Sequence, residues 1–384
     1  MNHFIPLSVP NLKGNELKYV TEAVNTEWVS TGGPYVTEFE NKIAEYAHVK
    51  GAVACQNGTA GIHTALMTIG VGANDMVIVP TLTFIAAVNP VKYIGAEPVF
   101  MDSDDSLCID PAKLKKFCEN ECDFINGKLI YKKTEQNVKA IVVVHVFGNM
   151  ADMENILKTA RHYNLKVVED ATEAIGTYYI EGALKGCFAG TMGDIGIYSF
   201  NGNKIITTGG GGMIVSNNEE YLKTAKHLTT QAKSDELNYK HDMIGYNYRM
   251  TNLQAALGIA QLEQLEKFIE IKNKNYDLYE KLLADTGYGL MKFRKNIRSN
   301  KWFYALLCAD CSRRDELIKY LLDKNIQTRP IWGLINEQKP YLGSEAYEIE
   351  KAKYYWEHVI NIPCSTNISE ADIKTVVEQI KLFK

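Results

Sequence analysis

The stretch KAIVVVHVFGNMADMENILKTARHYNLKVVED, residues 139–170, carries the pattern that decides the fold. It opens with branched apolar residues, continues with a helical pattern over 151–163 and ends in a second apolar run at 166–170. Short branched-apolar runs are typical of strands buried on both faces, and an intervening helix joins two parallel strands. The stretch therefore predicts a strand–helix–strand unit of a parallel sheet.

Similar apolar runs lie on both sides of this unit, with another helix expected at 59–69. They are residues 51–55, 76–80, 97–101, 195–200 and 211–216, and 139–148 and 166–170 complete the set. These runs predict an α/β protein with a mainly parallel, seven-stranded sheet covered on both faces. Functional groups should collect at the carboxyl ends of its strands.

The pattern changes near residue 250. Thr251 and Gln254 form a capping-box signature, and apolar residues then recur at helical spacing through Phe268. This predicts one long amphipathic helix that leads into a smaller α/β domain. We expect an N-terminal arm, a large domain and a small domain over 1–12, 13–247 and 248–384.

Composition excludes several classes of protein. The net charge of -4 over 384 residues does not indicate a basic surface for binding nucleic acid or an anionic membrane. The sequence shows neither a signal-peptide pattern nor an apolar run of membrane-spanning length, so we expect a cytoplasmic location. The eight cysteines do not resemble a disulfide scaffold, and the Cys308/Cys311 pair lacks the second ligand pair of a zinc site. We expect no metal.

VVEDATEAIG, residues 167–176, places Asp170 at the end of a buried strand. An ionised carboxylate there needs a positive partner, and a pyridinium nitrogen is such a partner. The alternative is a helix N-cap.

GDIGIYSFNGNKIITTGGGGMIV, residues 193–215, places one lysine, Lys204, in a Gly- and Thr-rich loop between two apolar strands. Such a lysine suits Schiff-base chemistry, and Ser199 beside it could donate to a phosphate. The alternative is a solvated lysine beside a glycine hinge.

Three further segments offer groups for a phosphorylated, flat ligand. In CQNGTAGIHTAL (55–66), Gly58 and Thr59 open a helix whose N-terminus suits an anion. Phe84 follows the strand at 76–80 and could stack on a heteroaromatic ring or belong to the core. In HDMIGYNYRM (241–250), Asn247 and Tyr248 could reach a ligand or fix the domain junction.

Taken together, these blocks resemble the sugar aminotransferases of the DegT/DnrJ/EryC1/StrS family, which have the aspartate-aminotransferase fold, type I of the pyridoxal-phosphate enzymes. The resemblance runs almost end to end, through STGGPYVTEFE (30–40), NGTAG, PTLTF, HVFGNM, VVEDATEAIG, SFNGNK and GYNYRMTNLQAALG.

The resemblance implies pyridoxal 5'-phosphate as cofactor, with Lys204 as its Schiff-base partner and Asp170 at its ring nitrogen. Glu173 would contact the ring hydroxyl and Phe84 would stack on the ring. Phosphate contacts are expected from Gly58, Thr59, Ser199 and, across a homodimer, Asn247. Substrate contacts are expected at Thr31, His145, Tyr248 and Trp332.

The resemblance also implies a reaction. Glutamate would donate its amino group to C4 of a nucleotide-linked 4-keto-6-deoxy-N-acetylhexosamine. Glu173 replaces the glutamine of most members and points to the bacillosamine or legionaminic acid branch. Another 3-keto or 4-keto sugar nucleotide stays open as the acceptor. Lys204 argues against dehydratases of this fold, which carry histidine there, and a non-catalytic regulatory protein is the remaining alternative.

Overall fold

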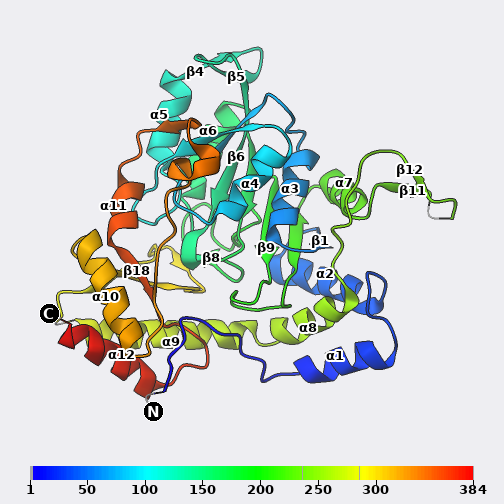
Figure 1. Ribbon diagram of the computed structural model, residues 1–384. Coiled ribbons are helices and arrows are strands. Elements are labelled where there is room, and N and C mark those ends of the chain that lie inside the picture. Colours follow the sequence, from blue (N-terminus) through cyan, green and yellow to red (C-terminus); the bar gives the residue numbers. More distant parts are fainter. Residues whose placement is uncertain (1–2, 236, 285, 384) are drawn as a thin grey trace.

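The computed structural model describes residues 3–235, 237–284 and 286–383, and its centre is a mixed sheet (Figure 1). Along the sheet the strands follow the order β1-β10-β9-β7-β6-β2-β3-β17. They are β1 (Gly51–Cys55), β10 (Gly212–Ser216), β9 (Ile195–Ser199), β7 (Lys166–Asp170), β6 (Asn137–Val144), β2 (Met76–Pro80), β3 (Glu97–Met101) and β17 (Glu345–Tyr347). The pairs from β9 to β17 are parallel, whereas β10 runs antiparallel to both neighbours. The prediction of a mainly parallel α/β sheet is confirmed.

The predicted count of seven strands is too small, because the central sheet has ten strands among the residues that the structure describes. All seven predicted strands lie side by side, and β17 adds a parallel strand beyond β3. The hairpin of β4 (Cys122–Ile125) and β5 (Lys128–Tyr131) pairs with β6. These additions are short edge strands without a long apolar run, so sequence pattern alone does not reveal them.

Helices cover the sheet. The helix α3 (Gly58–Thr68) packs on β7, β9 and β10, while α7 (Glu219–Thr229) packs on β1 and β10 and α6 (Met153–His162) packs on β7. Further helices beside the sheet are α2 (Pro34–Ala47), which packs on β1, α4 (Asn89–Tyr93), which packs on β3, and α5 (Pro111–Asn120), which packs on α6. Because both faces are covered, β9 and β10 are buried along their whole length.

The single long helix predicted after residue 250 is wrong: the segment forms two helices, α8 (Asn252–Leu262) and α9 (Leu265–Leu283). The predicted capping box of Thr251 and Gln254 is confirmed at the start of α8. The helix α8 packs on α2 and on α1 (Glu16–Asn25), whereas α9 packs on α12 (Glu370–Leu382). Because of the break, α8 and α9 pack against different helices. The apolar periodicity of the sequence shows only which residues are buried, so it does not reveal the break.

The C-terminal part builds a second, antiparallel sheet in the order β13-β15-β18-β16. Its elements are β13 (Gly289–Leu290), β15 (Tyr304–Leu307), β16 (Arg329–Pro330) and β18 (Val359–Ile362), with α10 (Cys311–Asp323) and α11 (Lys351–His358) beside them. The proposed boundary at residue 248 stays a prediction, since β17, from the C-terminal part, belongs to the central sheet.

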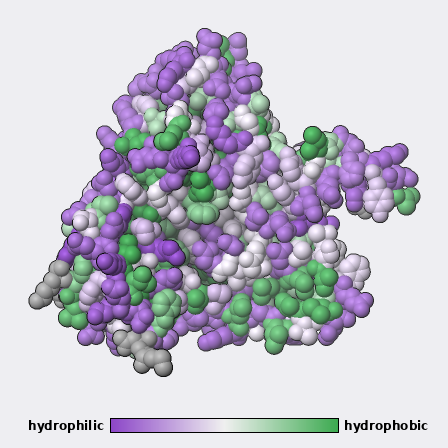
Figure 2. All heavy atoms as spheres, in the orientation of Figure 1, coloured by the Kyte–Doolittle hydropathy of each residue, from purple (hydrophilic) through white to green (hydrophobic). Residues whose placement is uncertain are grey.

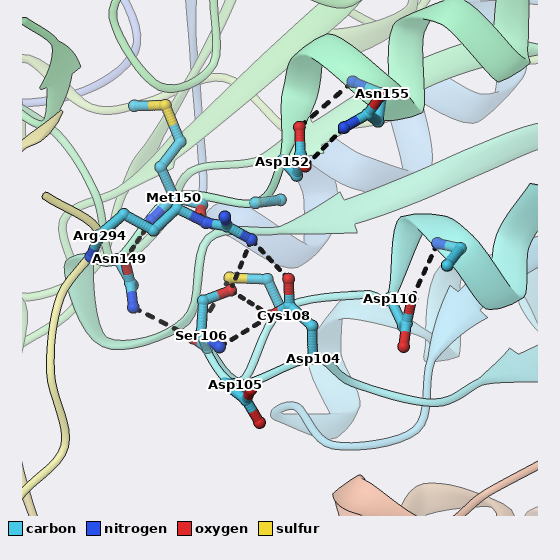
Figure 3. A network of polar contacts seen from close by, with 12 residues as sticks. Asp104, Asp105, Ser106, Cys108, Asp110, Asn149, Met150, Asp152, Asn155 and Arg294 are labelled. Carbon is cyan, nitrogen blue, oxygen red and sulfur yellow. Dashed lines mark hydrogen bonds and ion pairs between the residues drawn. The ribbon is translucent and has the colours of Figure 1, made fainter. Parts of the chain in front are cut away.

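A polar network ties the start of the C-terminal sheet to the large sheet (Figure 3). The Arg294 guanidinium donates to the carboxylate of Asp104 and, at 2.8 Å, to the carbonyl of Met150. Asn149 accepts the Arg294 N–H at 3.1 Å and its amide donates to the Ser106 carbonyl at 3.3 Å. Burial raises the pKa of the Asp104 carboxyl even though Arg294 opposes the shift. The network therefore fixes the two parts in one arrangement.

Two surface features stand apart from this core. The hairpin of β11 (Lys233–Asp235) and β12 (Lys240–His241) projects from the body (Figure 1). Apolar side chains gather over α1 and the segment after it (Figure 2), where Leu17, Val24, Trp28 and Val29 are exposed. Among the residues described, no helix is long and apolar enough to cross a membrane.

Candidate active site

A cavity of about 290 Å³ lies where β2, β6, β7 and β9 end, at the carboxyl edge expected from the sequence. It brings together eight of the predicted site residues: Gly58, Thr59, Phe84, Asp170, Glu173, Ser199, Lys204 and Trp332. They come from separate segments of the chain, so the fold alone assembles them.

Lys204 lies in the loop between β9 and β10, with its side chain turned into the cavity. Its Nζ lies 3.5 Å from Glu173 Oε1 and 4.3 Å from the centre of the Trp302 ring. Two hydrogen bonds to the Phe200 carbonyl fold the loop, from the N–H of Thr208 and the hydroxyl of Thr207. The lysine is thus held on a braced loop, and the alternative of a solvated hinge lysine does not describe it.

Glu173 is a buried carboxyl that faces Lys204. Its Oε2 accepts the N–H of Phe147 at 2.8 Å. Phe147 has a φ of 56°, a left-handed conformation that is uncommon for a residue other than glycine. Burial raises the pKa of Glu173 to about 7, although Lys204 and the Phe147 N–H oppose the shift. This carboxyl therefore changes charge close to neutral pH.

Asp170 ends β7 beneath the same cavity. Its Oδ1 accepts the N–H of Thr172 at 3.0 Å. Burial raises the pKa of the carboxyl, while Thr172 and the charge of Lys204 act in the opposite direction. A buried carboxylate with few donors is stabilised by a cationic ligand group, and a protonated pyridine nitrogen supplies that charge.

The start of α3 forms the end of the cavity suited to an anion. Asn57 caps the helix by accepting the N–H of Ala60 at 2.8 Å. A Cβ on Gly58 would lie 3.0 Å from Thr172 and 3.2 Å from Ser199, so a larger residue would crowd these two. The helix N-terminus and the hydroxyls of Thr59 and Ser199 together fit a phosphate group.

Four predicted contacts lie outside the cavity wall. His145 is fully buried: its Nε2 lies 2.9 Å from Glu169 Oε2, and its Nδ1 accepts the N–H of Ala151. The Tyr248 hydroxyl lies 3.3 Å from His63 Nδ1. Asn247 is exposed beyond the projecting hairpin, and Thr31 is half-buried ahead of α2. The roles expected for these four residues stay predictions.

Part of the cavity wall was not predicted from the sequence. Trp302 and Phe303 contribute aromatic surface from the C-terminal part, and Thr172 and Asn203 contribute polar groups. KWFYALL reads as an ordinary apolar strand, so nothing in it marks Trp302 as a site residue.

The chain is similar to known proteins along nearly its whole length. Residues 10–381 match the DegT/DnrJ/EryC1/StrS aminotransferase family. GDP-perosamine synthase of Escherichia coli O157:H7 is 39% identical over 381 residues, which are 99% of this chain and 98% of that protein. EpsN of Bacillus subtilis strain 168, whose name describes a pyridoxal phosphate-dependent aminotransferase, is 35% identical over 98% of this chain and 95% of its own.

The crystal structure of a DegT DnrJ EryC1 StrS aminotransferase from Brucella abortus superposes with a TM-score of 0.87. It is 27% identical and covers 96% of this chain and 95% of its own. The chain belongs to the DegT/DnrJ/EryC1/StrS aminotransferase family. It is a pyridoxal-phosphate-dependent sugar aminotransferase, and the cavity around Lys204 and Asp170 fits that cofactor.

Proposed function

We propose that this enzyme moves the amino group of glutamate to C4 of a nucleotide-linked 4-keto-6-deoxyhexose used for bacterial surface glycans. The observation that carries the proposal is the cavity that Asp170 lines and in which Lys204 Nζ lies 3.5 Å from Glu173 Oε1. Membership of a family of sugar aminotransferases supports the class of substrate. A cytoplasmic location stays a prediction from the sequence.

Each side chain has a task in this proposal. Lys204 anchors the cofactor and afterwards carries a proton at Nζ, which is general acid–base work by a group already in place. Asp170 keeps its negative charge beside the ring nitrogen. Glu173 lies within reach of Nζ and tunes the charge of the site. The bound pyridoxal phosphate supplies an electron sink that stabilises negative charge on the substrate carbon.

Two acceptors compete in the proposal. By the family resemblance, Glu173 points to an N-acetylhexosamine of the bacillosamine or legionaminic acid type, with the nucleotide left open. The name of the relative from Escherichia coli, GDP-perosamine synthase, favours a GDP-linked sugar. Purified enzyme should be given glutamate and a matched panel of UDP- and GDP-linked 4-keto-6-deoxy sugars, with and without the N-acetyl group. The acceptor with the highest kcat/KM identifies the substrate, and no transfer to any sugar of the panel would refute the proposed function.

Absorbance spectroscopy of the purified protein distinguishes an active enzyme from a non-catalytic regulatory protein. An active aminotransferase shows visible absorbance from its bound cofactor, and glutamate alone bleaches this band. A regulatory protein of the same fold would keep the band in glutamate. A dehydratase would consume the keto sugar without taking nitrogen from glutamate.

We also propose that the enzyme works as a homodimer with shared sites. The apolar surface over α1, which includes Leu17 and Trp28, is typical of a protein–protein interface. We infer that a second copy of the chain binds there. Asn247 follows the projecting hairpin in the chain, forms a bridge with Thr230, and is exposed in one chain. In a dimer Asn247 would reach the phosphate in the partner's cavity.

A further inference from the structure

Trp302 contacts the catalytic lysine from the C-terminal part of the chain. The centre of its ring lies 4.3 Å from Lys204 Nζ, and the side chain is almost completely buried. The indole Nε1 donates to the carbonyl of Asn203 at 2.9 Å. Asn203 directly precedes Lys204, so this bond fixes the indole to the lysine's own loop.

The backbone of Trp302 is anchored on both sides. Its N–H donates to Asn300 Oδ1 at 3.0 Å, and its carbonyl accepts from the buried ammonium of Lys272. The Lys272 ammonium also donates to the carbonyl of Cys364 at 2.6 Å. These bonds anchor the backbone segment that carries the indole.

Asn300 joins this anchor to the other side of the lysine. Its Nδ2 donates to the carbonyls of Glu173, at 2.9 Å, and Ile175, at 3.0 Å. Asn300 is fully buried, so one side chain connects the backbones of Trp302 and Glu173. The carboxyl and the indole that flank Lys204 Nζ therefore keep a fixed spacing.

We propose that Trp302 is a positioning residue for Lys204, whose ammonium form it holds over the indole face beside Glu173. This inference rests on the proposed function, in which Nζ becomes an ammonium each time it carries a proton. A cation is attracted to the face of an indole, and the attraction is strongest where water is excluded. A leucine or methionine is smaller than tryptophan, and fills part of the space without offering such a face.

The first test uses the cofactor-free protein and does not depend on turnover. Lysine labelled with ¹³C at Cε is incorporated, and the Lys204 resonance is identified by its absence in Lys204→Ala. Protons above an indole face are shifted upfield, so the wild-type Cε protons should be displaced. The displacement should be lost in Trp302→Leu and partly kept in Trp302→Phe. An undisplaced wild-type resonance, or one unchanged in Trp302→Leu, would overturn the proposal.

Trp356→Phe is the matched control, because Trp356 also lies near a cation, with its ring centre 5.8 Å from the guanidinium carbon of Arg314. Trp356 is not among the residues that line the cavity, so this substitution should leave the Lys204 resonance unchanged. If Trp302→Leu does not fold, Trp302→Met serves as the second non-aromatic variant.

The second test measures the glutamate half-reaction of the holoenzyme in a single turnover. Bleaching of the cofactor band should be about tenfold slower in Trp302→Leu at saturating glutamate, with recovery of most of the rate in Trp302→Phe. Equal rates in Trp302→Leu and wild type would refute the role. The sugar is absent from both tests, so failure of the acceptor panel and failure of this inference are distinguishable.

Discussion

Glu173→Gln in the cofactor-free protein tests the electrostatics of the site most directly. The Glu173 carboxyl is buried, and its pKa is raised from 4.5 to about 7. Glutamine has nearly the same shape and still offers an oxygen to the Phe147 N–H, which lies 2.8 Å from the carboxylate. The substitution therefore removes the titration while leaving the main hydrogen bond.

The raised pKa of Glu173 determines how the free energy of unfolding changes with pH. The folded protein keeps a proton on Glu173 that the unfolded chain releases near pH 4.5, so the stability contributed by the neutral carboxyl is complete below that pH. It is lost as the pH rises through about 7, where burying the ionised group becomes a cost. Glu173→Gln does not lose this stability, because glutamine does not ionise. Relative to wild type it should gain about 3 kcal/mol between pH 4 and pH 8.

Equilibrium urea unfolding, followed by tryptophan fluorescence across this pH range, measures the difference. Glu181→Gln is the control, because Glu181 is exposed and the substitution removes a surface carboxylate. Infrared spectroscopy supplies a second readout, a carboxylic-acid band in wild type that disappears with rising pH and is missing from Glu173→Gln. Parallel stability curves for wild type and Glu173→Gln would show that the carboxyl is not held neutral.

Three further predictions concern the cofactor and the assembly. Lys204→Ala should lose turnover and the visible band of the lysine-bound cofactor but melt at a temperature close to wild type; near-normal transamination would contradict the anchoring role. Asp170→Asn should keep part of the cofactor binding but lose several orders of magnitude in kcat, and a rate within about tenfold of wild type (about 1.4 kcal/mol) would sink the ring-nitrogen assignment. Mixed dimers of Lys204→Ala and Asn247→Ala should recover up to half of wild-type activity, since one site is then free of both lesions. No recovery from two impaired variants would place both residues in the same site of one chain.

The strands of the sheet could be predicted closely from the sequence. The predicted runs at 51–55, 76–80, 97–101 and 166–170 coincide with β1, β2, β3 and β7. Strands buried on both faces are almost continuously apolar, so their limits are visible in composition. The residues that follow these strands then face a common cavity because the strands are parallel. This geometry is why the sequence predicts Asp170 and Lys204 at one edge of the sheet, and both line the cavity.

Side chains that meet through tertiary packing could not be predicted in the same way. Trp302 is 98 positions from Lys204 in the chain and lies in a segment that reads as core. The break between α8 and α9 leaves no mark either, because the apolar stripe continues across it. The contact partners of His145 were equally invisible in the sequence: its ring nitrogens pair with Glu169 and Ala151, and its role as a substrate contact stays a prediction.

The groups that fit the cofactor and the groups expected to contact the sugar come from different parts of the chain. The groups that fit the cofactor, Asp170, Lys204 and the start of α3, belong to the central sheet and its loops. The facing wall of Trp302, Phe303 and Trp332 comes from the C-terminal part of the chain. Changes on that wall can alter which sugar is accepted while the cofactor groups stay in place. Trp302 is the exception, since its ring also contacts the catalytic lysine.

We therefore expect substitutions at Trp332 to change the preference among the UDP- and GDP-linked sugars without altering the glutamate half-reaction. Substitutions at Trp302 should instead slow both the glutamate half-reaction and the sugar half-reaction. A panel that shows the same sugar preference in Trp332→Ala and wild type would contradict this division.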